Sequence, residues 1–576
     1  MSRISRRTVL HAAGVGALAA PAVSRLGAAS AAATDPTRDP RAQWLQLEPL
    51  IRQWWRDFGG RADEAAVRAD PNLLFLPFPT HGFGTALPGW DTYFANLGLL
   101  AHGLSDFVKD HVLDQLFLIE RYGYVPNGNQ LAVLTRSHPP LWPEGIRRYL
   151  QAGGDRDVAM IAYPQLVREY TGYWSADHHS TPIGLTTNRD LGDPGLSPIL
   201  AAEAETGLDF TPIFGGDVRR CAPIQTNVLL ANYEQVLAWL AAQVGRAREA
   251  AEWQRKRDQR VRLIQQFCWD AGSGFFFEYD YVAKKSLPYW SLCAYWAMWA
   301  GIATPAQAAQ LVAQLPKFER DYGVTMTDRS YPDPHQPTDP FWCQWQYPTG
   351  WPNMQMMVVE ALQRYGYRTE AKRIAKKYVD LMTDLFFNRG ATDDITGNRN
   401  TSDSAPKLTG DHTAGQTFSA PKSFTRAGGR FATYTTTGAG MRLTLRRGGP
   451  EGDPVVSSRF DDVYDNSWLY AESAQPLPAG EYYLEQSEPA GTIAWYSSSK
   501  DAYAAGSAYV DGAAVAGDRV FAVEAPGSGG TNELWEKYNV VEGNLDLPPS
   551  HYGEIWTDQG WSYGAAAVLG RLAYGE

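Results

Sequence analysis

Residues 107–119, FVKDHVLDQLFLI, place apolar side chains at steps of three and four residues. The stretch 228–240 repeats this spacing with Val228, Leu229, Tyr233, Val236, Leu237 and Leu240. This spacing gives each helix one apolar face, and long helices of this kind bury their faces against each other in antiparallel pairs. Further candidate helices span 91–104, 248–268, 289–300, 305–314, 353–365, 369–387 and 560–574. We therefore predict a mainly α-helical chain.

Near Gly390 the composition changes to Thr, Ser, Gly and Asp. Short alternating runs follow at 429–434, 441–446, 480–485, 492–496 and 519–523. Alternation with period two, with turn residues between the runs, predicts an inserted antiparallel β-sandwich. We expect residues 34–395 and 528–576 to form the two parts of a catalytic helical domain and 405–527 to form the insert. The insert is either a structural buttress or a carbohydrate-binding module, whose candidate platforms are Tyr434, Trp468, Tyr482, Trp495 and Tyr496.

Residues 1–33 consist of a basic start, a short apolar stretch and a run of small residues. This three-part pattern is typical of an export signal that is later removed. Arg6 and Arg7 form a pair that resembles a twin-arginine signal, which a bacterial export receptor would recognise. The apolar stretch is shorter than the ~20 residues of a spanning helix, which disfavours a membrane anchor. We expect a secreted or periplasmic protein with no membrane contact after signal removal.

The formal net charge of the 576-residue chain is −11. This charge argues against binding to nucleic acid, which needs a basic face to displace counterions from the phosphates. Cys221, Cys268, Cys293 and Cys343 are widely spaced, with no C-x-x-C pair. A zinc site is therefore not expected, and both disulfides and buried free thiols remain open.

Three regions rich in Trp, Gly and Pro lie at junctions between loops and helices. They contain Trp90, Asp91, Asn127 and Arg136; Asp209; and Gln344, Trp345, Glu536 and Glu554. Long connections of this kind are uncommon unless they carry a site. Aromatic surroundings raise the pKa of one carboxyl so that it stays protonated, while a better solvated carboxyl stays ionised, as acid/base catalysis requires. For Asp91 the alternative is a helix cap before Thr92.

The tract 90–140 resembles the trehalase family of glycoside hydrolases (family 37), through WDTYF at 90–94, PNGN at 126–129 and LTRSHPP at 134–140. Residues 344–352, QWQYPTGWP, are similar to the family's second signature, and 536–538, EKY, to a later element. The resemblance covers most of 45–390 and 531–574 and omits the insert. It implies an (α/α)6 barrel that hydrolyses an α-glucosidic bond of a small carbohydrate with inversion, without metal or organic cofactor.

Carried over by position, the resemblance implies Asp209 as general acid and Glu554 as general base. Inversion needs the two carboxyl groups roughly 6.5–9.5 Å apart, so that a water fits beside the base. The family positions that hold the glucosyl unit fall on Trp90, Asp91, Asn127, Arg136, Gln344 and Trp345. Two alternatives remain, an interloop ion pair for Arg136 and a core role for Trp345. Glu536 and Asp558 are the next candidates for the base.

The chain also departs from the family pattern. The charged residues of the first signature are missing from 81–88, and Gln346 stands where Asp is usual. The segment 205–209, ETGLD, also resembles the related family 63 α-glucosidases and mannosylglycerate hydrolases. Because a sugar subsite rejects ligands that leave its polar groups unpaired, these changes favour another small α-glycoside over trehalose. A different α-glycosidase and a catalytically inactive carbohydrate-binding protein are the alternative functions.

Overall fold

The computed structural model describes residues 39–575 apart from 58–61, 63, 70–73, 81–86, 130–132, 194–195, 336–342, 400, 435, 437, 462, 464, 549–554 and 558. Helices occupy most of the chain up to residue 387, and a final helix closes it. They are α1 (Pro40–Asp57), α2 (Glu64–Ala69), α3 (Asp91–Ala101), α4 (Ser105–Tyr122), α5 (Trp142–Gln151), α6 (Asp157–Glu169), α7 (Pro198–Ala204), α8 (Ile224–Gln243), α9 (Ala247–Phe267), α10 (Trp296–Trp299), α11 (Pro305–Gln314), α12 (Pro352–Arg364), α13 (Arg368–Phe387) and α14 (Gly560–Tyr574).

Neighbouring helices differ in how much of their surface they bury. Helix α8 is buried on nearly every side, whereas α9, which packs against it, buries only Trp253 and Ile264. The same difference separates α12 from α13, which keeps many charged residues outside. A helix that is apolar all round belongs inside and an amphipathic one outside, so each such pair has an inner and an outer member.

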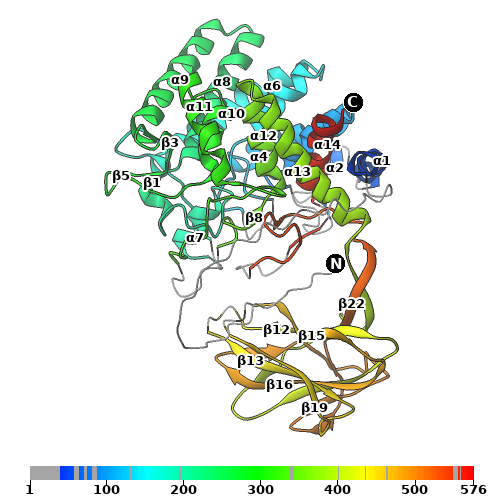
Figure 1. Ribbon diagram of the computed structural model, residues 1–576. Coiled ribbons are helices and arrows are strands. Elements are labelled where there is room, and N and C mark those ends of the chain that lie inside the picture. Colours follow the sequence, from blue (N-terminus) through cyan, green and yellow to red (C-terminus); the bar gives the residue numbers. More distant parts are fainter. Residues whose placement is uncertain are drawn as a thin grey trace, which may run out of the picture.

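Strands follow α13 and form a second body, drawn below the helices in Figure 1. They are β9 (Gly390–Gly397), β10 (Lys407–Leu408), β11 (Ala414–Ala420), β12 (Phe424–Ala432), β13 (Gly440–Arg447), β14 (Pro454–Phe460), β15 (Ser467–Leu477), β16 (Gly480–Ala490), β17 (Ile493–Trp495), β18 (Ser497–Ser498), β19 (Ala508–Val510), β20 (Ala513–Val515), β21 (Asp518–Arg519) and β22 (Phe521–Gly530).

Two antiparallel six-stranded sheets make up this second body. One contains β10, β17, β12, β22 and β9, with β15 also paired to β12, and the other has the order β14-β13-β16-β11-β19-β20. Phe431 and Trp495 from the first sheet and Leu443 and Tyr482 from the second lie in one buried cluster. Their shared core is separate from the core of the helices.

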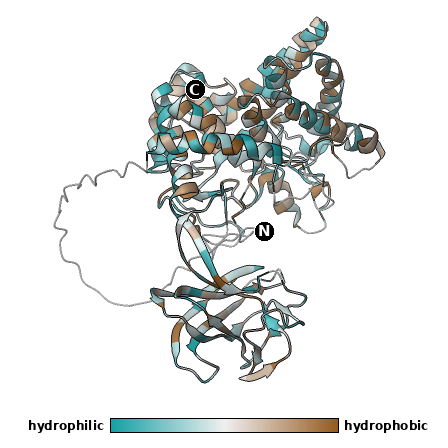
Figure 2. Cartoon of the chain, turned by 90° about the vertical axis from the view of Figure 1, so that its right-hand side faces the viewer, coloured by the Kyte–Doolittle hydropathy of each residue, from teal (hydrophilic) through white to brown (hydrophobic). Residues whose placement is uncertain are grey.

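Two antiparallel strands, β9 and β22, connect the two bodies. Gly390 of β9 is paired with Gly530 of β22, and the backbone N–H of Thr531 donates to the carbonyl of Leu385 at the end of α13. Figure 2 shows these strands running between the helical body and the sheets below it. The strands thus begin and end at the same point of the helical body.

The prediction of a mainly helical chain with a sheet domain is confirmed by the elements. Strands β12, β16 and β22 run several residues beyond the predicted alternating stretches. Of the expected helix at 289–300, α10 covers only Trp296–Trp299. Strands β11, β14 and β15 lie outside every predicted stretch. Among the described helices, none is long and apolar enough to cross a membrane. All four cysteines are buried free thiols, which was one of the two possibilities left open by the sequence, the other being disulfides.

Candidate active site

Asp209 lies in the turn that follows α7. Gly207 and Phe210 on either side of it have φ of +70° and +61°, so the chain passes through two left-handed residues within four positions. The backbone N–H of Thr211 donates to Glu203 Oε1 at 2.9 Å and closes the turn. A left-handed Phe is unusual because its Cβ crowds the backbone, so contacts from the rest of the fold must hold this turn in place.

Two side chains from a distant segment donate hydrogen bonds to the carboxylate of Asp209. The indole N–H of Trp345 lies 3.3 Å from Oδ1, and Nε2 of Gln344 lies 3.2 Å from Oδ2. Residues that the sequence assigned separately to acid catalysis and to sugar binding are therefore in direct contact.

A short strand pair brings the C-terminal part of the chain to the same place. Strand β8 (Thr349–Gly350) pairs with β23 (Tyr538–Asn539). As a result Lys537 Nζ donates to Gln344 Oε1 at 2.8 Å and lies 3.8 Å from Glu536 Oε2. Lys537 is almost fully buried, and sequence reasoning gave it no role, although the E-K-Y match contained it.

Asp91, Asp209 and Glu536 share one electrostatic environment. Burial, together with the charges of Glu536 and Asp209, raises the pKa of Asp91 to about 8, and a backbone hydrogen bond opposes this shift. Burial also raises the pKa of Glu536, with Asp209 adding to the effect and with Lys537 and the N–H of Trp556 opposing it. Neighbouring carboxylates that cannot all ionise at neutral pH can divide the roles of acid and base.

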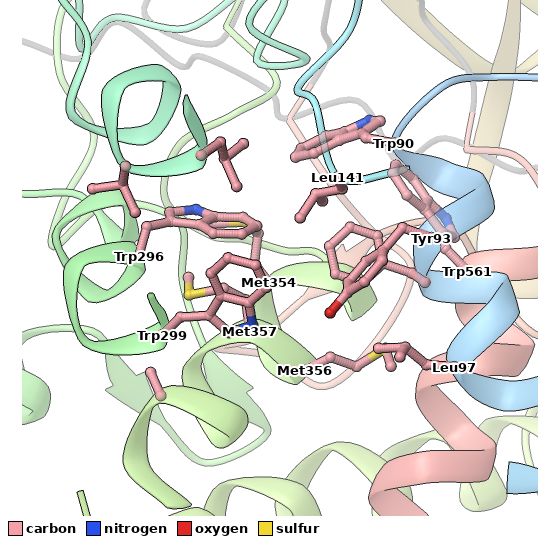
Figure 3. Close-up of a cluster of buried hydrophobic side chains, with 14 of the residues drawn as sticks. Trp90, Tyr93, Leu97, Leu141, Trp296, Trp299, Met354, Met356, Met357 and Trp561 are labelled. Carbon is pink, nitrogen blue, oxygen red and sulfur yellow. The ribbon is translucent and has the colours of Figure 1, made fainter. Parts of the chain in front are cut away.

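Tryptophans form one wall of the site. Trp345 stacks on Trp351 with ring centroids 3.7 Å apart and an interplanar angle of 9°. Trp90 lies 5.7 Å from Trp345 and 6.2 Å from Trp561. In Figure 3, Trp90 and Trp561 lie at one end of a buried apolar cluster that continues to Trp296, Trp299 and the methionines of α12. The aromatic wall is therefore anchored in the main core.

Asp91 is the first residue of α3, and the cap position before it is occupied by Trp90, which makes no side-chain capping bond. The capping alternative is therefore not observed. Its Oδ2 is buried, lies 3.9 Å from His138 Nδ1 and has no hydrogen-bond partner among the described residues.

Asn127 and Arg136 make hydrogen bonds and ion pairs to other segments of the helical body. Asn127 Nδ2 donates to the carbonyl of Ala204 at 3.3 Å. Arg136 is 4% exposed and forms an ion pair with Asp193, and its Nη1 is also 3.5 Å from Asp190. This arrangement is the interloop ion pair that the sequence left open for Arg136.

Buried polar contacts that sequence reasoning missed support the turn around Asp209. Glu205 accepts hydrogen bonds from Tyr173, from His179 at 3.0 Å and from Asn188 at 3.1 Å. Burial raises the pKa of Glu205, but these partners lower it more. On the other side, Glu203 Oε2 lies 3.1 Å from His335 Nε2. The sequence signal for these two carboxylates was the E-x-E spacing before Asp209. Its meaning is clear only when the fold shows which residues contact Glu203 and Glu205.

Glu554 and Asp558 lie outside the described residues, so the structure gives no position for the expected base. Within the described part of the chain, no group of three or more His, Cys, Asp or Glu side chains is arranged to hold a metal ion. The described site instead offers carboxylates, amides and indole faces, which suit a neutral polyhydroxy ligand.

The trehalase family model matches residues 82–192 and 204–393, slightly more than half of the chain. The chain belongs to the trehalase family. The resemblance seen in the sequence is thereby confirmed, and both matched ranges include residues of the site described above. Asp209 with Trp345 and Gln344 lies within the second range, and Trp90 and Asp91 lie within the first.

Several trehalases are similar to this member of the trehalase family. The cytosolic neutral trehalase of Kluyveromyces lactis is 27% identical over 429 residues, covering 60% of this chain and 56% of the relative. The cytosolic neutral trehalase of Saccharomyces cerevisiae is 28% identical over 401 residues, covering 56% and 53%. The chain spans about half the length of the curated relatives it matches.

Two solved structures are also similar to this chain. The neutral trehalase of Saccharomyces cerevisiae has 28% identity and a TM-score of 0.48, covering 54% of this chain and 67% of that one. The family 63 mannosylglycerate hydrolase of Thermus thermophilus, in complex with glucose, has 18% identity and a TM-score of 0.43, covering 58% and 91%.

The expectation of export is contradicted. Relatives from several organisms are named cytosolic neutral trehalases, which opposes secretion and a twin-arginine receptor as partner. Arg6 and Arg7 lie outside the described residues. A basic start followed by a short stretch of Ala, Gly and Val is a pattern of low information, because these residue types are common and no packing constraint selects their order.

Proposed function

We propose that this protein hydrolyses trehalose or a related small α-glucoside by general acid/base catalysis with inversion of configuration. The observation that carries the proposal is the carboxylate of Asp209, which is fixed by Trp345 and Gln344 and whose charge contributes to the raised pKa values of Asp91 and Glu536. Family membership supports hydrolysis of a glycosidic bond, and trehalase is the name of the relatives.

Asp209 is the proposed general acid, which protonates the glycosidic oxygen as the bond breaks. The base removes a proton from a water on the opposite face of the sugar. We assign the base to Glu536, because it is buried, interacts with Asp209 and has a pKa raised toward neutrality while Lys537 beside it favours the ionised form. Glu554, expected from the sequence, is the competing assignment.

Sugar binding is supported by buried polar atoms around the site that lack hydrogen-bond partners among the described residues. They are Asp91 Oδ2, Trp351 Nε1, Trp561 Nε1 and both polar side-chain atoms of Gln559. Most buried polar groups in native proteins are hydrogen-bonded, so unpaired ones in a site point to a bound ligand. Hydroxyl groups both donate and accept and would satisfy acceptors and donors alike. We assign Trp90, Asp91, Gln344 and Trp345 to the glucosyl unit, with Asn127 and Arg136 supporting them from behind.

The fold proposed for this function is an (α/α)6 barrel formed by residues 34–395 and 528–576, with 405–527 inserted as a β-sandwich. The alternation of inner and outer helices supports a barrel, and the two six-stranded sheets with one core support a sandwich. The barrel arrangement would bring α3, the turn after α7 and the segment before α12 to one end, where the site lies.

Carboxylate-to-amide variants test the roles. Asp209→Asn and Glu536→Gln should each lose roughly 10²–10⁴-fold in kcat, while Glu554→Gln should lose less than Glu536→Gln. Glu451→Gln, in an exposed turn, is the control for the chemical change. α-Glucosyl fluoride, whose leaving group needs no proton, should rescue Asp209→Asn far better than Glu536→Gln. A larger loss in Glu554→Gln would move the base to Glu554. Release of α-glucose first from α-glucosyl fluoride would refute inversion.

A second candidate substrate, a small α-glycoside other than trehalose, is favoured by Gln346. Its Oε1 accepts a hydrogen bond from the backbone N–H of Tyr331 at 2.9 Å. At the position where the family pattern has Asp, this chain therefore has a glutamine that holds a loop. A comparison of kcat/KM values decides between the two candidates. The substrates are trehalose, kojibiose, nigerose, maltose, isomaltose, glucosylglycerate and mannosylglycerate. The highest kcat/KM on trehalose would exclude this candidate, and binding without release of reducing sugar would identify an inactive carbohydrate-binding protein.

A further inference from the structure

A cavity of about 450 Å³ opens in the β-rich body. It lies where three strands of one sheet end together. Phe431, near the end of β12, is paired with Trp495 of β17 and with Ser467 of β15. Asn466 and Tyr496 are adjacent to these paired residues, and Tyr434 lies two residues beyond the end of β12. All three line the cavity.

Tyr434 is held in an unfavourable backbone conformation with its ring exposed. Its φ is +54°, and 46% of its surface is accessible. Asp465 Oδ1 accepts the N–H of Tyr434 at 2.9 Å, and the hydroxyl of Tyr434 donates to the carbonyl of Ala405 at 2.5 Å. A bulky residue in the left-handed region costs on the order of 1–3 kcal/mol, and such strain concentrates at functional sites.

The second tyrosine is fixed in a similar way. The hydroxyl of Tyr496 donates to Oδ1 of Asn466, whose own φ is +62°. A cation lies over each ring, Lys407 at 4.7 Å from the centroid of Tyr434 and Arg430 at 5.0 Å from that of Tyr496. Because both hydroxyls are engaged and one face of each ring holds a cation, the groups left for a ligand are the opposite ring faces.

The polar groups of the cavity are carboxylates, an amide and hydroxyls. Asp403, Ser404, Asp465 and Asn466 supply them. The carboxylates disfavour phosphates and other anions, and no metal-holding cluster occurs among the described residues. A neutral ligand with an apolar face and several hydroxyls matches this lining, and the volume lies within the usual range for small-ligand pockets.

We propose that this cavity is a binding site for a pyranose unit of a polysaccharide, separate from the catalytic site. The sugar ring lies on Tyr434 and Tyr496, and its hydroxyls bind Asp403, Asp465 and Asn466. Of the other aromatic candidates, Tyr482 and Trp495 are 1% and 0% exposed and belong to the core, and Trp468 does not line the cavity. The sheet body is thus a carbohydrate-binding module and not only a buttress.

Affinity electrophoresis of the full chain tests the site, with soluble starch, glycogen, β-glucan, xylan or arabinogalactan in the gel. The Asp209→Asn background prevents turnover. At least one polysaccharide should retard the protein, and Tyr434→Gly should weaken that binding at least tenfold. Glycine tolerates positive φ, so the melting temperature of Tyr434→Gly should equal or exceed that of the parent. Trp468→Ala, an aromatic change outside the cavity, should leave retardation unchanged.

Tyr434→Gly made in the otherwise native chain should hydrolyse a small soluble α-glucoside at the parent rate, which separates this site from the catalytic one. Absence of retardation by all five polysaccharides, or equal retardation of the parent and Tyr434→Gly, would overturn the proposal. Loss of retardation in Trp468→Ala with retention in Tyr434→Gly would overturn it as well, because binding would then lie elsewhere. The retardation results do not depend on whether the proposed hydrolytic function is correct.

Discussion

Trp345 donates its indole N–H to Asp209 Oδ1 at 3.3 Å while its ring stacks on Trp351. One side chain therefore connects the proposed acid to the aromatic core. A carboxylate held by a rigid ring stays oriented without reorganising during the reaction, which is the condition for efficient proton transfer.

Trp345→Phe tests this relationship. The ring face remains but the donor is lost, and a hydrogen bond to a charged group contributes about 1.5–3 kcal/mol. We expect kcat to fall by about one to two orders of magnitude with a smaller change in KM, measured by release of reducing sugar. Trp296→Phe is the matched control, because its buried indole N–H has no partner among the described residues. Equal loss in both variants would assign the effect to packing alone.

The buried Asp91 gives the stability of the protein a defined pH dependence. Its pKa in the folded protein is about 8 against 3.8 for an exposed Asp, so between these values the folded state binds the proton more tightly than the unfolded state. This contribution therefore falls as pH rises from 4 to 8. Asp91→Asn, which cannot ionise, should gain melting temperature relative to the parent over this range while losing activity.

Asp155 is the control with the opposite sign. It is exposed, and its hydrogen bond with Lys109 lowers its pKa. Any stability it contributes is present above pH 4 and is lost below it. Asp155→Asn should therefore show no gain between pH 4 and 8. A difference between Asp91→Asn and the parent that does not change with pH would contradict the ionisation argument.

Substitution of Arg136 should lower the stability of the protein more than it weakens substrate binding. It is buried with Asp193 and Asp190, and removing one partner of a buried ion pair leaves an uncompensated charge at a cost of about 3–5 kcal/mol. Arg136→Met should lower the unfolding free energy in urea by this amount, and adding Asp193→Asn should recover part of it. A raised KM with unchanged stability would instead support the direct sugar contact that the sequence implied.

Much of the helical part could be predicted from sequence because each helix carries its own periodic signal. The expected helix at 305–314 coincides with α11, and that at 560–574 with α14. A capping role for Asp91 required helix α3 to begin at Thr92. The helix begins at Asp91 instead, and Trp90 occupies the cap position. Strand ends were harder to predict, since β12 begins at Phe424, whereas the predicted stretch began only at Gly429.

The site was only partly predictable, because its contacts join distant segments. The sequence placed Gln344, Trp345 and Glu536 in one region and Asp209 in another. The hydrogen bonds of Gln344 and Trp345 to Asp209 join the two regions, and the pairing of β8 with β23 brings Lys537 to Gln344. The carboxylates Glu203 and Glu205 could not be given a role from the sequence, because their partners, His335 and His179, come from elsewhere in the chain. Electrostatic roles depend on burial, which a motif does not encode.

Gly207 links the turn of Asp209 to the aromatic wall. Its φ is +70°, and an added Cβ would lie 2.8 Å from Cε2 of Trp90 and 2.9 Å from Cγ of Pro139. Gly207→Ala therefore combines backbone strain with displacement of two side chains packed against the site. We expect a loss of at least tenfold in kcat/KM together with a lower melting temperature.

Gly103→Ala separates the two causes, because Gly103 has φ of +72° and nothing lies within 4 Å of its added Cβ. It should lose stability through backbone strain alone, typically about 1 kcal/mol, and keep its kcat/KM. The activity loss in Gly207→Ala is then caused by the contact with Trp90. Because Trp90→Phe shortens the ring system, the double variant Gly207→Ala/Trp90→Phe should recover part of the melting temperature lost in Gly207→Ala. If Gly103→Ala and Gly207→Ala lost stability equally and both stayed active, the close packing of Gly207 on Trp90 would have no part in positioning Asp209.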